Sequence, residues 1–170
     1  YLGDECLHYG QQAAAGSGPF GGQPMQLEGD TWHSTSYKLY CGGQSRLDFR
    51  PYDTISFYMK WCSDAGCADP LGASSPLNIT FLISTWDRAS SEVRIDDYME
   101  GPLSNAWQQV TIPLADPATA TYDMYAVDYI QWPSMFGGVY FVDAVVLSTA
   151  PESVAGAAPL AANTTIRGMG

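Results

Sequence analysis

Alternation of apolar and polar side chains constrains this fold more than any other feature of the sequence. Residues 54–62 show it most clearly, with apolar side chains at every second position: Ile55, Phe57, Met59 and Trp61. The side chains between them are Ser56, Tyr58 and Lys60. Because successive side chains of a β-strand point to opposite faces of a sheet, this segment predicts a strand with one buried face.

Further segments carry the same kind of pattern, some of them less regularly. They are residues 31–40, 78–87, 92–98, 107–114, 127–132 and 138–147. Turn-forming pairs separate the segments, among them Gly42-Gly43, Gly101-Pro102 and Gly137-Gly138. Helical periodicity is scarce. Many short strands joined by tight turns predict an all-β chain, built as an antiparallel sandwich or barrel.

Length and charge bound the remaining choices. A chain of 170 residues predicts one folded domain, which we assign to residues 1–149. Residues 150–170 are rich in Ala and Pro, which is typical of a linker leading toward a following domain. The formal net charge of -11 would repel nucleic acid phosphates. No apolar run is long enough for membrane insertion.

The four cysteines predict two disulfides. One would join Cys62 and Cys67 across a glycine-containing turn, which leaves Cys6 to pair with Cys41. A zinc site is the alternative, but the sequence offers only two histidines and no CxxC spacing to complete it.

Two sequons point to the same compartment as the cysteines. They predict N-linked glycosylation at Asn78 and Asn163. Disulfides and glycosylation together indicate a secreted, extracellular protein or one of the cell wall.

Three segments in the last third of the chain resemble a known family. They are Trp107-Gln-Gln-Val-Thr-Ile-Pro-Leu114, Val127-Asp-Tyr-Ile-Gln-Trp132 and Gly138-Val-Tyr-Phe-Val-Asp-Ala-Val-Val-Leu147. Their pattern is similar to the C-terminal strands of jelly-roll carbohydrate-binding modules of the galactose-binding-like type. The resemblance implies an antiparallel two-sheet β-sandwich. It also implies a non-catalytic extracellular module that holds a polysaccharide or other glycan on its concave sheet.

The resemblance implies which strands carry the ligand. Residues 31–40, 78–87, 92–98 and 127–132 would form the concave sheet, and the other strands the convex one. Alternation within the concave strands then turns a set of candidate carbohydrate-binding side chains outward: Trp32, Trp86, Arg94, Asp96, Tyr129 and Gln131. Aromatic rings stack on sugar C–H faces, while charged and amide groups pair with hydroxyls.

Each of these residues also has a structural interpretation. The aromatic rings would instead fill the core or cover loops, and Arg94 and Asp96 would form a solvated ion pair. The remaining tryptophans, Trp61, Trp107 and Trp132, are assigned to packing.

The resemblance also implies a structural calcium ion. An Asp at the position of Asp143 often ligates Ca²⁺ in these modules, with oxygens from the first strand and from the loop before the third. Asp4 or Glu5, and Glu28 or Asp30, are the local candidates for those oxygens. The alternative is that the Asp143 carboxylate caps loop amides.

Catalysis within this chain is not expected. Two histidines and oxidised cysteines offer little for a nucleophilic triad. On one strand face, Glu92 and Asp96 would lie about 13 Å apart, beyond the ~5–9.5 Å that separates the carboxyl groups of glycosidases.

Two further hypotheses complete the sequence analysis. The run Thr165-Ile-Arg-Gly-Met-Gly170 resembles the first strand of a family of glycoside hydrolase barrels, which implies an attached catalytic domain. The alternative function is a structural or adhesive module of an extracellular coat or fibre that binds protein neighbours. Low lysine content, glycosylation and the Ala/Pro tail suit that function as well.

Overall fold

The computed structural model describes most of the chain. Nearly all of the regular structure in the described residues consists of β-strands. The described residues are 7–8, 10–12, 16–22, 24–28, 35–38, 47–70, 72–75, 79–84, 92–115, 124–132, 137–149 and 163–165. The strands are β1 Leu7–His8, β2 Gly10–Gln12, β3 Met25–Glu28, β4 Thr35–Lys38, β5 Thr54–Cys62, β6 Thr80–Ser84, β7 Val93–Arg94, β8 Gln108–Pro113, β9 Tyr129–Trp132, β10 Val139–Ser148 and β11 Asn163–Thr165.

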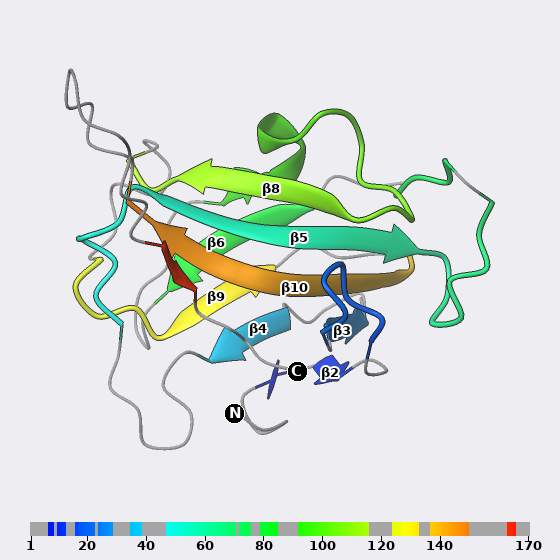
Figure 1. Cartoon of the computed structure of the whole chain (residues 1–170), viewed down its shortest axis with the longest axis horizontal. Helices are drawn as coiled ribbons and strands as arrows, with labels where there is room; N and C mark the ends of the chain where they lie inside the picture. The colour runs from blue at the N-terminus through cyan, green and yellow to red at the C-terminus, as the bar shows by residue number, and fades with distance from the viewer. Residues whose placement is uncertain are drawn as a thin grey trace.

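These strands form two antiparallel sheets packed face to face. The A sheet has the order β1-β4-β9-β6-β7, and the B sheet has the order β2-β3-β10-β5-β8, with β11 paired to β10. Figure 1 shows β8, β5 and β10 of the B sheet in front of β6 and β9 of the A sheet. The prediction of an antiparallel β-sandwich is confirmed, and so is the division of the longer strands between two sheets.

The core lies between the sheets and is rich in aromatic rings. Phe57 of β5 packs against Phe81 of β6 and Trp132 of β9, with ring centroids 5.5 Å apart in each pair. Trp132 is fully buried, and Trp61 is nearly so. Trp61 Nε1 donates a hydrogen bond to the Gly137 carbonyl. The assignment of these two tryptophans to packing is confirmed.

A β-bulge divides β10 into two halves with different inward positions. Asp143 pairs with Tyr58, but the next pair joins Val146 to Ser56. Ala144, within the bulge, has a positive φ of 51°. Core side chains therefore fall at even positions before the bulge and at odd positions after it: Tyr140, Val142, Val145 and Leu147.

The expected strand over residues 92–98 is wrong in its second half. Only β7, Val93–Arg94, is a strand, and Ile95–Tyr98 forms the short 3₁₀ helix η3. Ile95 still donates its N–H to the Ile79 carbonyl, and its side chain is fully buried. The chain curls after this anchor, where two consecutive aspartates have low strand propensity. The strand spacing assumed for Glu92 and Asp96 therefore does not apply.

The expected linker is corrected at one point. β11 pairs in antiparallel register with β10, Thr165 opposite Val146 and Asn163 opposite Ser148. Residues 163–165 thus belong to the B sheet, while the other residues of 150–170 lie outside the described residues.

The structure contains the local disulfide expected between Cys62 and Cys67. Cys6, Cys41 and Asn78 lie outside the described residues, so the second disulfide and that glycosylation site remain predictions. Among the described residues, no helix is long and apolar enough to cross a membrane.

Candidate functional site

The outer face of the A sheet places two of the predicted binding residues at its centre. In β9, Ile130 and Trp132 are buried toward the core, so Tyr129 and Gln131 point to the other face, where both side chains are half-buried. β9 is the middle strand of the A sheet, with β4 on one side and β6 on the other. The alternation proposed for this strand is confirmed.

The amide of Gln131 is held by the neighbouring strand. Its Nε2 donates a hydrogen bond of 2.6 Å to Ser84 Oγ of β6. An amide group has two N–H donors and a carbonyl acceptor, and this bond uses one donor. The amide is therefore oriented before any ligand arrives. Strand alternation places Ser84 on the same face, but the pairing register that brings it to Gln131 is not readable from the sequence.

The outward side chains of the neighbouring strand β6 are mostly buried. Leu82 pairs with Gln131, and Ser84 pairs with Tyr129, so all four residues share the outer side. Leu82 and Ser84 are nevertheless buried, with 7% and 3% of their surface exposed. On the β6 side of β9, this face therefore offers little accessible surface.

The charged pair predicted for the site lies at one edge of the sheet. Arg94 pairs with Thr80 at the start of β6, which puts it two strands, about 10 Å, from β9. The Arg94 guanidinium lies 3.6 Å from the Asp96 carboxylate, and both side chains reach solvent. The structure thus brings Tyr129 and Gln131 together and leaves Arg94 and Asp96 apart from them. Trp32 and Trp86 lie outside the described residues.

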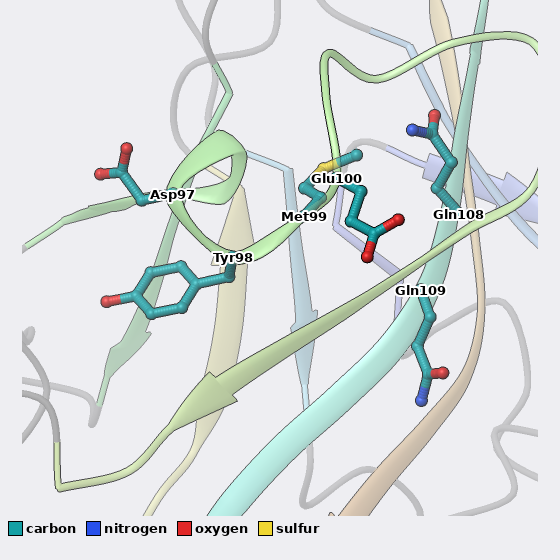
Figure 2. Close-up of a pocket in the computed structure, with 6 residues that line it drawn as sticks. All are labelled: Asp97, Tyr98, Met99, Glu100, Gln108 and Gln109. Carbon is teal, nitrogen blue, oxygen red and sulfur yellow. The ribbon is translucent and has the colours of Figure 1, made fainter.

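An open cleft of about 640 Å³ lies elsewhere, between the end of η3 and the edge strand β8. Its lining residues, shown in Figure 2, are Asp97, Tyr98, Met99, Glu100, Gln108 and Gln109. The Gln108 amide makes hydrogen bonds within the protein: its Oε1 accepts from the Ser104 N–H and hydroxyl, and its Nε2 donates to the Pro102 carbonyl. In Figure 2 the Glu100 carboxylate points toward Gln109, whereas Asp97 and Tyr98 point away from it. The cleft therefore does not join the predicted residues into one pocket.

Asp143 is a buried carboxylate on the outer face of the B sheet. Only 8% of its surface is exposed, and burial raises the pKa of its carboxyl group. Asp143 Oδ1 accepts a hydrogen bond of 2.7 Å from the Ala144 N–H. Residues 16–22 fold across the carboxylate so closely that a Cβ atom at Gly18 would overlap Oδ2. A glycine is required there because any side chain would displace the carboxylate.

Among the other predicted calcium ligands, Glu28 belongs to the described residues, and its backbone lies away from Asp143. Glu28 pairs with Val139, four residues and about 13 Å along β10 from Asp143. Asp4 lies outside the described residues. Among the described residues, no group of three or more His, Cys, Asp or Glu side chains is placed to hold a metal ion.

Comparisons with known proteins show which solved structures share this fold. No protein-family model and no curated protein matches the chain by sequence. Among solved structures, the family 30 carbohydrate-binding module of a cellulosomal cellulase of Clostridium thermocellum superposes with a TM-score of 0.59 at 14% identity, over 88% of this chain and 89% of that one. The chain has the jelly-roll fold of carbohydrate-binding modules.

Two other solved structures share this module fold. The family 11 carbohydrate-binding module of the Clostridium thermocellum cellulase Lic26A-Cel5E matches with a TM-score of 0.52 at 19% identity, over 85% of this chain and 82% of that one. A β-1,2-glucanase from Parabacteroides distasonis matches with a TM-score of 0.52 at 15% identity, and the matched part is 82% of this chain but only 20% of the glucanase.

Proposed function

We propose that the module is a non-catalytic carbohydrate-binding domain that holds a β-linked glucan along β9 on the outer face of the A sheet. The observation that carries the proposal is the pair Tyr129 and Gln131, half-buried side by side on the middle strand, with the Gln131 amide fixed by Ser84. The Tyr129 ring can stack on a pyranose, and the amide can pair with its hydroxyls.

The structural relatives support this choice of ligand. One solved structure of the family 11 module, with a TM-score of 0.51, is a complex with a β-1,3-1,4-mixed-linked tetrasaccharide. The family 30 relative comes from a cellulase, and the third relative is a β-1,2-glucanase. A neutral glucan also suits a chain with a net charge of -11, which would repel an anionic polysaccharide.

The remaining predicted residues have places in this proposal. Arg94 and Asp96, at the β7 edge, would meet a ligand only where it leaves β9 and crosses β6. Trp32 and Trp86 are proposed as further stacking surfaces of the same sheet. Because such contacts are few and exposed, we expect dissociation constants in the micromolar to millimolar range.

A structural calcium ion at Asp143 is a separate part of the proposal. The buried carboxylate and the glycine segment 16–22 packed on it suit a cation, which would offset the cost of burying the charge. Backbone carbonyls of that segment are better placed than Glu28 to supply further oxygens, because Glu28 is about 13 Å along the strand. Such an ion would hold residues 16–22 against the B sheet.

Compartment and partners follow from the same function. We propose that the protein is extracellular, in keeping with its Cys62–Cys67 disulfide and its sequons at Asn78 and Asn163. By holding a polysaccharide, the module would raise the local substrate concentration for an attached glycoside hydrolase domain. Its own role needs no catalytic residue.

Binding to soluble and insoluble polysaccharides tests the proposal. Affinity electrophoresis and pull-down should show retention by mixed-linked β-1,3-1,4-glucan or cellulose, and Tyr129→Ala should abolish it. Tyr58→Ala is the control variant, because Tyr58 is half-buried on the outer face of the opposite sheet. Retention by no glucan would overturn the proposal, and self-assembly of the purified chain instead would favour the structural or adhesive alternative.

A further inference from the structure

An exposed aromatic ring, Tyr125, precedes the first residue of β9. Tyr125 and Phe20 are the exposed large hydrophobic residues of the described chain, with 60% and 70% of their surface accessible. Phe20 leans edge-on against Tyr58 of the B sheet, with ring centroids 5.0 Å apart. Tyr125 instead precedes β9 by a few residues, so it belongs to the end of the A sheet.

The chain on both sides of Tyr125 is fixed to this end of the A sheet. Val127 forms an antiparallel bridge with Leu47, with both backbone hydrogen bonds made, and Phe49 donates its N–H to the Met124 carbonyl at 2.7 Å. These pairs hold the Tyr125 backbone from either side. Three residues lie between Tyr125 and Tyr129, so their Cα atoms are at most about 14 Å apart. An oligosaccharide of a few sugar units can span any distance up to that limit.

The Tyr125 ring is part of a fixed group of three side chains. The Arg50 guanidinium lies over the ring, 4.4 Å from its centroid. Asp48 holds that guanidinium through two hydrogen bonds, from Nε at 2.9 Å and from Nη2 at 2.7 Å. Asp48 also accepts the Arg50 backbone N–H. The stack is therefore oriented before binding, and with 60% of Tyr125 exposed it still leaves apolar ring surface in water.

The chemistry of this group matches a sugar ring. A pyranose offers an apolar C–H face to an aromatic ring and equatorial hydroxyls at its edge. Around the Tyr125 ring, those hydroxyls would meet a guanidinium with several N–H donors and a carboxylate that accepts. A neutral ligand leaves the Asp48–Arg50 pair intact, whereas an anionic ligand would compete with Asp48 for the guanidinium.

We infer that Tyr125, Arg50 and Asp48 form an outer subsite, the end platform, which binds the terminal sugar units of a glucan chain already held along β9. The inference rests on the proposed function of the A sheet. The end platform adds affinity only when the ligand is long enough to reach from Tyr129 to Tyr125. It makes the module select long chains over short ones.

Binding measured as a function of ligand length tests the inference. The probes are β-1,3-1,4-glucan oligosaccharides from disaccharide to hexasaccharide, titrated calorimetrically into wild-type protein and three variants. Tyr125→Ala should weaken binding of the longest oligosaccharides about three- to tenfold, the amount one aromatic stack contributes, and leave the disaccharide unchanged. Phe20→Ala, at the other exposed ring, should leave the affinities for the longest oligosaccharides and for the disaccharide unchanged. Arg50→Lys, which keeps the charge but loses the planar stack, should fall between wild type and Tyr125→Ala.

The outcomes separate the end platform from the site on β9. Equal losses at all lengths, or no loss at any length, for Tyr125→Ala would overturn the end platform while leaving the site on β9 intact. Failure of the wild-type protein to bind any of the oligosaccharides would overturn the glucan proposal, and the end platform with it. A thermal unfolding profile unchanged from wild type confirms that Tyr125→Ala remains folded.

Discussion

Gln131 and Ser84 are joined across adjacent strands by a hydrogen bond of 2.6 Å from the Gln131 amide to the Ser84 hydroxyl. The acceptor is nearly inaccessible, with 3% of its surface exposed, whereas the amide is half-buried. A hidden residue thus sets the direction of an accessible one. This arrangement lets the sheet present an ordered polar group to a ligand.

Removing the Ser84 hydroxyl should loosen the site without destroying it. Ser84→Ala should weaken glucan binding about two- to fivefold, because one hydrogen bond that orients Gln131 is lost. The free energy of unfolding should fall by about 1 kcal/mol or less, since the half-buried amide can turn to water. Calorimetric titration and urea unfolding measure the two effects. An affinity unchanged from wild type would show that the bond does not serve binding.

The buried charge of Asp143 predicts a pH-dependent stability. Because burial raises the pKa of this carboxyl group, the folded protein binds its proton more tightly than the unfolded chain does. The free energy of unfolding should therefore fall as the pH rises from the ordinary Asp range through the raised pKa, and the cost is fully present above that raised pKa. Asp143→Asn should remove this dependence and, in a chelator, be at least as stable as wild type at neutral pH.

The proposed calcium site predicts the opposite order of stability in Ca²⁺, with wild type more stable than Asp143→Asn. Thermal unfolding of wild type should shift upward when Ca²⁺ replaces the chelator, and Asp143→Asn should show no such shift. Gly18→Ala, which places a methyl group against the carboxylate, should show a smaller shift than wild type. Equal responses of wild type and Asp143→Asn to Ca²⁺ would refute calcium at this carboxylate.

Lys60 covers an aromatic cluster on the outer face of the B sheet. Its ammonium lies 5.1 Å from the ring centroid of Trp107 and 4.7 Å from that of Phe141, and burial lowers its pKa. Lys60→Ala should lower the free energy of unfolding by about 1 kcal/mol, because it removes both the cation–π contact and the aliphatic stem. Lys60→Met should recover most of the loss, measured by urea unfolding. A larger loss with Met than with Ala would contradict this account.

The Cys62–Cys67 disulfide closes a short loop beside the same cluster. Closing a loop this short stabilises the fold by about 2 kcal/mol in the chain-entropy estimate. The double variant Cys62→Ala and Cys67→Ala should lose about that amount in urea unfolding, while its glucan affinity stays unchanged because the loop is on the B sheet side. Loss of glucan binding in a folded double variant would indicate that the ligand binds on the B sheet, and would contradict a site on β9.

Local alternation predicted the fold and the outward direction of Tyr129 and Gln131, because side-chain direction in a strand follows from neighbouring positions. Tyr129 and Gln131 were found in this way. Contacts that depend on pairing register were not predictable: Ser84 opposite Tyr129, or Asp143 beneath Gly18, far away in sequence. The 3₁₀ turn at Ile95–Tyr98 was missed because Val93 and Ile95 continue the alternation up to the point where the chain curls.

We propose that the glucan lies on the outer face of the A sheet, and amide chemical-shift mapping by NMR is the sharpest test of this placement. Adding the β-1,3-1,4-mixed-linked tetrasaccharide to labelled protein should shift amides of β9 and of its neighbours β4 and β6. Amides of β5 and β8, on the B sheet, should stay in place. Shifts confined to β5, β8 and β10, or no shifts at millimolar ligand, would contradict the account.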